Sequence, residues 1–364
     1  MEYIVAFSLS IFFIYKSQQN RLGYYSYFLS ILPIIVIAAL RTIEIGVDTG
    51  VYVYPLFRLA KLQSSLTKLF DYSSHEEFYL IYAYVLTRFC KNFNEYLFWE
   101  HSLMYGFAVY ALYKIRHKIQ VWQSLFILLF VFYRESLNIA RQSFAIYIDL
   151  IAFTFLIGNK YKLSILFAVL AYGFHHSSPI FFFVIVLKIC IDKFRYYFTK
   201  RKIKILLILG LFAIFTFFSY VANYLEGLGV IEEKYVERYA RQGHYGANFP
   251  ISLFALCLVN LGVFYYVKFK RKIYKYDNNL ILFEYILIVA LICCFTGLIS
   301  TFTIRIGAYF WYMTIIIIPI LFNRYTKPDI ILKALFCFYA LYWILTVVIA
   351  NLSGTYPYIS VYSI

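Results

Sequence analysis

Long apolar runs recur along the whole chain, and short polar connections rich in Lys and Arg separate them. Most runs approach the length that crosses a hydrocarbon core of about 30 Å as a helix. They lack the strict alternation of barrel strands, and a bilayer leaves no partner for unpaired backbone groups, so helices are expected. The sequence therefore predicts about twelve transmembrane helices. The runs lie at 3–15, 23–40, 95–113, 119–133, 143–158, 162–175, 179–192, 203–221, 250–267, 279–296, 303–322 and 330–350.

Two apolar segments, 1–15 and 78–90, have alternative interpretations. Residues 1–15 have no basic start and no small-residue cleavage site before Lys16, so they are interpreted as the first span and not as a cleaved signal. Residues 78–90 are apolar but short, and they end between Arg88 and Lys91. A re-entrant or interfacial helix fits them better than a thirteenth span.

The composition excludes an ordinary soluble domain. The 364 residues are 63% hydrophobic and 14% charged, with a mean hydropathy of +0.73, whereas soluble domains carry about 25% charged residues. The six cysteines form no CxxC pair and no Cys/His cluster, so they are assigned to packing. The predicted fold class is all-α: a polytopic membrane protein with one integral membrane domain, 1–364.

The positive charge follows the positive-inside rule, which explains the net charge of +16 without a nucleic-acid partner. Short connections on one side of the predicted bundle hold 20 of the 34 Lys and Arg residues. That side is therefore predicted to be cytoplasmic, with both termini outside. The two long connections, 41–94 and 222–249, then lie on the extracytoplasmic side, where they could fold over a site.

The outer side differs in the kind of positive charge that it carries. Arginine makes up eight of its 12 basic residues, whereas lysine predominates inside. Arginine offers a planar fork of donors that suits phosphate, and topology alone does not require it. This asymmetry predicts a pyrophosphate-linked ligand on the outer face. The eight are Arg41, Arg58, Arg88, Arg134, Arg141, Arg238, Arg241 and Arg305.

Segment 41–49 is the first candidate site. Arg41 emerges at the outer end of the second span, and Gly46 permits a tight turn. Asp48 with Thr49 could bind a sugar, or Asp48 could act as a base. The alternative interpretation is an interfacial arginine followed by a turn and a helix cap at Asp48.

The second candidate lies between the fourth and fifth spans. If this connection is helical, Arg134, Asn138 and Arg141 share one face and direct two guanidiniums at one anion. Arg141 opens an apolar run, and Asp149 lies deeper in it, which favours function. The alternative is a plain surface pair between Glu135 and either arginine, worth about 0–1 kcal/mol.

A histidine pair marks the third candidate, the hairpin 174–179 between two apolar runs. An imidazole can take a proton from a hydroxyl near neutral pH, and a neighbouring carboxylate increases its basicity. His175 is therefore a candidate base. The alternative, favoured for His176, is a hydrogen bond within the turn. No third ligand lies nearby in sequence, so no metal site is predicted.

Connection 231–245 reads as a short amphipathic helix that carries Tyr235 and Tyr239 together with Arg238 and Arg241. Tyrosines beside charges suit sugar stacking, but tyrosine is also common at any membrane interface.

Arg305 lies two residues inside an apolar run. An unpaired charge there costs about 2.5 kcal/mol or more at depth. Binding of an anionic head group is the preferred interpretation, and snorkelling to the interface is the alternative.

These residues together resemble the EpsG-type branch of the Wzy polysaccharide polymerases. The resemblance spans nearly the whole chain, although each motif is short. Val47 stands where a Thr is commoner, and no Pro follows Glu77, which leaves the register of that helix open. The residues that carry the resemblance are Arg41, Gly46, Asp48, Thr49 and Tyr52; Glu76 and Glu77; Arg141, Gln142 and Ala145; Phe174, His175 and Ser177; Arg305, Tyr309 and Phe310; and the tail Tyr356, Pro357 and Tyr358.

The resemblance implies a GT-C-like, lipid-linked glycosyltransferase bundle in the bacterial inner membrane, with its active site facing the periplasm or exterior. Such a protein joins undecaprenyl-pyrophosphate-linked repeat units into O-antigen or exopolysaccharide. Membrane lipid and a chain-length regulator protein are its implied partners, and no metal or cofactor is expected. His175 and then Asp48 are the expected bases. The expected substrate-binding residues are Arg41, Arg141, Arg305, Arg238, Arg241, Gln142 and Tyr235.

Two other function classes stay open. A lipid-linked oligosaccharide flippase needs charges along a central cavity, and the deep candidates are few. An O-antigen ligase is closer in chemistry and differs from a polymerase only through the resemblance. The deep charged residues are Asp149, Glu284, Glu100, Lys188 and Lys333.

Overall fold

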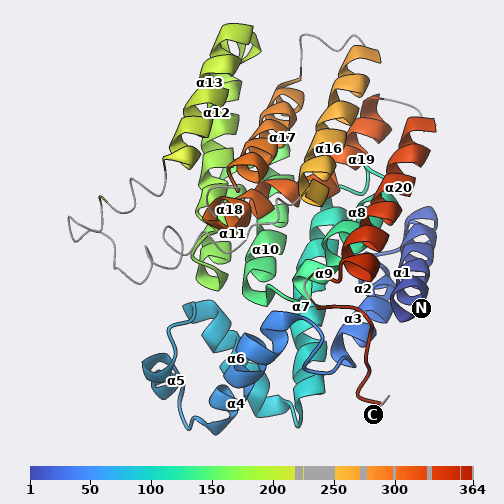
Figure 1. Cartoon of the computed structure of the whole chain (residues 1–364), viewed down its shortest axis with the longest axis vertical. Coiled ribbons are helices and arrows are strands. Elements are labelled where there is room, and N and C mark those ends of the chain that lie inside the picture. Colours follow the sequence, from blue (N-terminus) through green and yellow to red (C-terminus); the bar gives the residue numbers. More distant parts are fainter. Residues whose placement is uncertain are drawn as a thin grey trace. The chain divides into compact units, whose positions relative to one another are not determined.

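The computed structural model describes residues 1–217, 224, 251–270, 277–297, 301–325, 330–352 and 354–362. Within these ranges every named element is a helix, and the β pairing consists of one isolated bridge between Arg41 and Ser360 (Figure 1). Each of the twelve predicted apolar runs overlaps at least one helix as far as the description extends, whereas the number of twelve transmembrane helices stays a prediction. The all-α prediction is therefore confirmed for this part of the chain.

The chain divides into two compact units. Unit 1 comprises Met1–Pro179 and Ile318–Ile364, and unit 2 comprises Ile180–Ile317. Whether residues 1–364 form a single membrane domain, as the sequence predicts, is not decided by this division and stays a prediction.

Unit 1 contains the helices of the first six apolar runs and the last one, together with four helices from connection 41–94. Their bounds are α1 (Glu2–Gln19), α2 (Tyr24–Ser30), α3 (Leu32–Ala39), η1 (Thr49–Val53), α4 (Tyr54–Leu62), α5 (Leu66–Tyr72), α6 (Glu77–Phe89), α7 (Phe93–Lys114), α8 (Val121–Ile127), η2 (Leu128–Phe132), α9 (Tyr133–Ser136), α10 (Ala140–Ile157), α11 (Tyr161–Phe174), η5 (Leu321–Tyr325), α20 (Ile330–Trp343) and η6 (Ile344–Ile349), the η elements being π-helical turns.

Unit 2 is formed by the remaining apolar runs. Its bounds are α12 (Ile180–Thr199), α13 (Arg201–Thr216), α16 (Ile251–Lys270), α17 (Asn278–Thr296), α18 (Thr301–Trp311) and α19 (Thr314–Ile320), the last of which ends inside unit 1.

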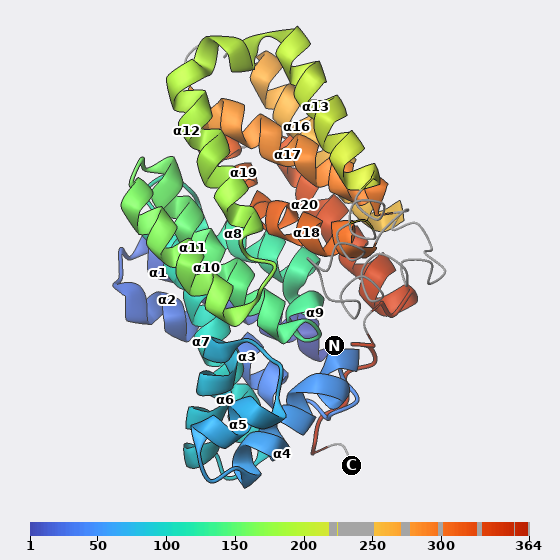
Figure 2. The ribbon, with the colours of Figure 1, turned by 90° about the vertical axis from the view of Figure 1, so that its left-hand side faces the viewer.

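Connection 41–94 folds into short helices, three of which group beside one end of α7 (Figures 1 and 2). Helix α6 packs against α4, α5 and α7. Side-chain caps define two of the starts: Ser65 Oγ accepts from the Lys68 N–H at the start of α5, and Asn92 Oδ1 accepts from the Glu95 N–H at the start of α7. A helix over the predicted segment 78–90 is confirmed as α6, and its re-entrant or interfacial position stays a prediction.

Helix α10 is the most enclosed span of unit 1, because 94% of its 18 residues are buried. It packs against α7 on one side and α11 on the other. Among the described residues, five helices are long and apolar enough to cross a membrane, and α10 is one of them. Together with the shorter apolar helix α11, these spans make the chain a membrane protein. All six cysteines are free and four of them are buried, in keeping with packing.

The segment after α3 is tied to the C-terminal residues of unit 1. The Thr42 N–H donates to the Ile359 carbonyl (3.0 Å), and the Val361 N–H donates to the Leu40 carbonyl (2.9 Å). These bonds hold Arg41 in a fixed place at the end of the second predicted span.

Candidate functional site

Three side chains from separate elements of unit 1 meet in an ionic cluster, called here the Glu76 cluster. Arg141 Nη1 lies 2.6 Å from Glu76 Oε2, and His175 Nδ1 lies 2.6 Å from Glu76 Oε1. The two partners are 65 and 99 residues away from Glu76 in sequence. Each carboxylate oxygen therefore has its own basic partner.

All three residues stand where a helix begins or ends. Glu76 has an extended backbone (φ −62°, ψ 141°) and immediately precedes α6. Arg141 is the second residue of α10, and His175 follows α11 in an extended conformation (φ −159°, ψ 124°). Helix α11 packs against both α6 and α10, which brings the three ends together.

A glycine allows α11 to approach α6 closely. A Cβ placed on Gly173 would come within 2.2 Å of the Phe78 ring, so a larger residue would force that ring aside. Gly173 lies two residues before His175, and Phe78 lies two residues after Glu76. The close approach thus sets the distance across the cluster.

Glu76 is a charged carboxylate inside the protein, with an exposed fraction of 4%. Burial raises its pKa, but the hydrogen bond from His175 and the positive charge of Arg141 outweigh burial, and the pKa is lowered overall. Glu76 therefore remains ionised at neutral pH.

The cluster orients the imidazole of His175. Because the Glu76 carboxylate accepts the hydrogen bond, Nδ1 of His175 is the donor, and Nε2 is the ring nitrogen outside this bond. A carboxylate on Nδ1 also stabilises the imidazolium that forms when Nε2 takes a proton. The His175 side chain is 17% exposed, so a ligand can reach it. The arrangement suits general base catalysis.

A second, open pair lies directly beside the cluster. His176 Nε2 is 3.8 Å from Glu77 Oε2, and these side chains are 47% and 65% exposed. Glu77 directly follows Glu76 in the sequence, and His176 directly follows His175. These two exposed residues therefore serve as controls for the two buried ones.

A hydrogen bond to α10 anchors the hairpin that carries His175. Ser178 Oγ donates to Asp149 Oδ2 (2.9 Å), and both residues are almost completely buried. Asp149 thus supports the hairpin, an assignment that the sequence alone did not suggest.

Arg41 lies inside unit 1, with an exposed fraction of 1%. Its Nη1 donates to the Ala38 carbonyl (2.7 Å) and to Nε2 of His101 (2.6 Å). Its Nη2 donates to Thr49 Oγ1 (3.2 Å). The predicted role of Arg41 in binding pyrophosphate stays a prediction.

Two further residues of segment 41–49 contact the connection that precedes α10. Thr49 Oγ1 donates to the Leu137 carbonyl (3.0 Å), and the Asp48 N–H donates to Asn138 Oδ1 (2.9 Å). The two motifs that were singled out separately in the sequence are thus neighbours. Asp48, which was the second candidate base, is half-buried beside this contact.

The predicted single face with Arg134, Asn138 and Arg141 is not formed. Helix α9 ends at Ser136 and α10 begins at Ala140, so a non-helical connection interrupts the i, i+4, i+7 spacing. Arg134 pairs instead with Glu135 at 3.7 Å.

The other predicted substrate-binding residues lie elsewhere. Gln142 is buried on α10 next to Arg141. Arg305 is exposed on α18 of unit 2. Tyr235, Arg238 and Arg241 lie outside the described residues.

The sequence analysis missed Glu76 as a member of the site. It appeared there only among the residues of the family resemblance, together with Glu77. The one available signal was its position in the outer connection with the most carboxylates, and that signal does not distinguish Glu76 from Glu77.

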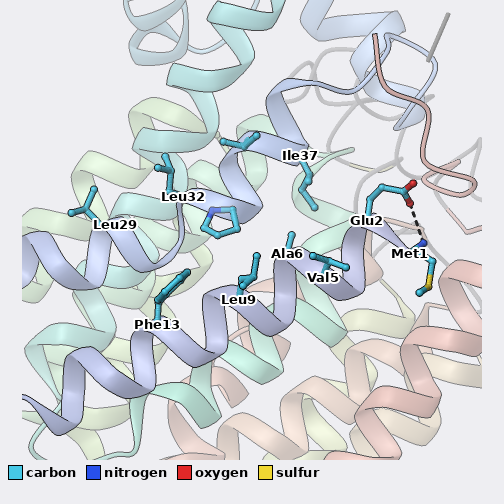
Figure 3. A pocket seen from close by; sticks show the side chains of 11 residues that line it. Met1, Glu2, Val5, Ala6, Leu9, Phe13, Leu29, Leu32 and Ile37 are labelled. Carbon is cyan, nitrogen blue, oxygen red and sulfur yellow. Dashed lines mark hydrogen bonds and ion pairs between the residues drawn. The ribbon is translucent and has the colours of Figure 1, made fainter. Parts of the chain in front are cut away.

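An apolar groove of about 640 Å³ lies between α1 and the α2–α3 pair (Figure 3). Leu9 and Leu29 line it and are 43% and 62% exposed. Such side chains suit contact with lipid chains, and the groove shares no residue with the Glu76 cluster. Among the described residues, no group of three or more His, Cys, Asp or Glu could hold a metal ion.

The fold and the site define a class of protein. It is a membrane protein, helical throughout its described elements, in which a buried carboxylate pairs with an arginine and a histidine where three helix ends meet. A family model describes the same chain over residues 24–360, and the chain belongs to the EpsG family. This membership makes it a membrane protein of the polysaccharide polymerase type. The chain matches no curated protein and no solved structure in the corresponding comparisons.

Proposed function

We propose that this protein is a polymerase that joins undecaprenyl-pyrophosphate-linked oligosaccharide repeat units into O-antigen or exopolysaccharide. The reaction would take place on the outer face of the bacterial inner membrane. The observation that carries the proposal is the Glu76 cluster, which supplies an oriented base beside a guanidinium within a protein of this family.

The chemical step is a glycosyl transfer. Nε2 of His175 takes the proton from an acceptor hydroxyl, and the freed oxygen pair attacks the anomeric carbon of the donor sugar. The bond from that carbon to the pyrophosphate oxygen breaks, and undecaprenyl pyrophosphate leaves with the electron pair. Glu76 stabilises the imidazolium until its proton passes to water.

Arginines are proposed to stabilise the leaving group. A guanidinium has five N–H donors, and the bond from Arg141 to Glu76 uses one of them. The Arg141 side chain is 25% exposed, which leaves it accessible to an anion. Hydrogen-bond donors placed beside a phosphate can stabilise the negative charge that develops on it without a metal ion. Arg305, Arg238 and Arg241 are the further proposed contributors, with Tyr235 and Gln142 on the glycan.

The proposed orientation rests on charge. The basic connections lie together on one side of a twelve-span threading, which places connection 41–94 and the 174–179 hairpin on the other side. The Glu76 cluster would then face the exterior, where lipid-linked repeat units become available. We further propose a GT-C-like arrangement of the spans, and contact with a chain-length regulator protein.

Local pairing of the deep charges favours a polymerase over a flippase. In unit 2, Lys188 Nζ lies 2.6 Å from Asp192, and Lys268 Nζ lies 2.9 Å from Glu284. The first pair lies within α12 and the second joins α16 to α17, so these charges neutralise one another locally.

The test is electrophoresis of surface glycan from cells that carry Glu76→Gln. We expect the long ladder to disappear while a single repeat unit remains, because export and ligation continue. Glu77→Gln is the matched control, since Glu77 is the adjacent residue and is 65% exposed; it should keep the ladder. Loss of all surface glycan in Glu76→Gln would instead point to a flippase or ligase, and an unchanged ladder would remove the cluster from the reaction.

A further inference from the structure

Arg41 stands at the centre of a buried set of polar side chains, called here the Arg41 network: Arg41, Thr49, Tyr79, Glu100 and His101. All five are at most 2% exposed. The network lies in unit 1, and its members come from four places in the chain. Its two ends reach the two helices that begin at the Glu76 cluster.

One branch leads to the start of α10. The Arg41 guanidinium donates to Thr49 Oγ1, and that hydroxyl donates to the Leu137 carbonyl (3.0 Å). Gly46 packs directly against the same carbonyl oxygen, since a Cβ on it would come within 2.4 Å of that oxygen. Its φ of +84° also favours glycine. Leu137 lies four residues before Arg141, so this branch fixes where α10 begins.

The other branch leads to the start of α6. Arg41 donates to His101 on α7, and Glu100 is the preceding residue of the same helix. Tyr79 donates its hydroxyl to Glu100 Oε1 (2.7 Å). Tyr79 lies about one helical turn after Glu76, on α6. This branch fixes the position of α6.

We propose that Arg41 is a positioning residue, whose buried network holds the starts of α6 and α10 so that Glu76 and Arg141 meet at the His175 hairpin. The proposal rests on the proposed function and replaces direct binding of pyrophosphate by Arg41. A guanidinium that is 1% exposed and has both terminal nitrogens bonded within the protein has no surface to offer an anion. The cost of burying such a charge is offset only where its hydrogen bonds have good geometry.

The test separates positioning from ligand binding by measuring kcat and KM of purified protein for a lipid-linked repeat unit. Thr49→Val and Tyr79→Phe each remove one hydroxyl from the network and keep the side-chain shape. We expect kcat to fall about tenfold to a hundredfold, because small displacements of reacting groups have effects of that size. KM and the inhibition by undecaprenyl pyrophosphate should change less than about twofold, since no ligand contact is lost.

The chain offers a matched control for each variant. Tyr82→Phe removes a hydroxyl from the same helix, and this hydroxyl has no hydrogen-bond partner among the described residues. Thr154→Val removes a buried hydroxyl of α10 that donates to the carbonyl of Ile151 in its own helix (2.7 Å). Both controls should keep kcat within about twofold, and thermal unfolding of all four variants separates lost rate from lost folding.

Arg41→Lys decides between the two roles. Positioning predicts a fall in kcat with unchanged inhibition by undecaprenyl pyrophosphate. The proposal is overturned if Arg41→Lys weakens that inhibition about tenfold or more while Thr49→Val and Tyr79→Phe behave as wild type. It is also overturned if the controls lose as much kcat as the network variants. Failure of wild-type protein to extend any lipid-linked repeat unit would instead contradict the proposed function.

Discussion

At the scale of single residues, the cluster depends on the balance between burial and pairing at Glu76. Moving a carboxylate out of water costs several kcal/mol, and two basic partners offset that cost only when both hydrogen bonds are well formed. The two 2.6 Å contacts meet this condition. Loss of either partner would leave a buried charge without full compensation.

The lowered pKa of Glu76 predicts how stability depends on pH. Because the pKa in the folded protein lies below the ordinary value of 4.5, the carboxylate stabilises the fold above pH 4.5. That contribution is lost as the pH falls below 4.5 towards the lowered pKa. We expect wild type to exceed Glu76→Gln by about 1–3 kcal/mol at pH 7. The difference should shrink below pH 4.5, as thermal unfolding in detergent at several pH values will measure. A constant difference from pH 7 to pH 3 would contradict this account of Glu76.

Arg141→Lys tests whether the fork of donors matters. A lysine can pair with Glu76 but cannot at the same time present parallel N–H groups to a pyrophosphate. We expect the protein to insert at normal levels and the glycan ladder to shorten or vanish. A ladder of normal length distribution would limit Arg141 to pairing with Glu76.

At the scale of secondary-structure elements, the site is assembled from helix ends, and the distance between α11 and α6 decides whether His175 reaches Glu76. Gly173 and Phe78 occupy this contact. A methyl group added there has to displace an aromatic ring that helps to pack the two helices.

Gly173→Ala should therefore reduce chain extension about tenfold or more, measured as the initial rate in membranes, because it moves the hairpin away from Glu76. Gly210→Ala on α13 is the control, since nothing lies within 4 Å of the added carbon. Alanine in an open helical position should be neutral or stabilise by about 0.5–1 kcal/mol. Equal activity of both variants would show that the close approach is unimportant.

Much of the helical structure could be predicted from apolar runs, because a helix that crosses a bilayer needs an uninterrupted apolar sequence whatever its packing. The breaks within these runs were harder to predict from the sequence. The run 23–40 divides at Ile31, where Pro33 in the first turn of α3 favours a new helix start. The run 303–322 divides after Trp311, and no residue there marks the interruption in the sequence.

The candidate site could be predicted only in part. Arg141 and His175 stood out because polar residues interrupt apolar runs. Their partner Glu76 did not, since pairing across 65 and 99 residues is decided by tertiary packing. Burial of Arg41 was likewise hidden, because a basic residue at the end of an apolar run looks the same whether it faces outward or inward.

At the scale of the whole molecule, the proposal requires the Glu76 cluster and the basic connections to lie on opposite sides of the membrane. Single cysteines introduced at exposed positions in a cysteine-free background can test this. Glu77→Cys should react with a membrane-impermeant thiol reagent in intact cells, whereas Lys118→Cys should react only after permeabilisation. The opposite pattern would place the cluster on the cytoplasmic side and contradict the proposed reaction.

The most direct measurement of the central claim is the initial rate of chain extension by purified protein in proteoliposomes, with His175→Ala compared with His176→Ala. The account predicts that His175→Ala lowers the rate by about a hundredfold or more, as expected for loss of a general base. His176→Ala should retain a rate close to that of wild type, because His176 is outside the buried cluster. Comparable rates for His175→Ala and wild type would contradict the account.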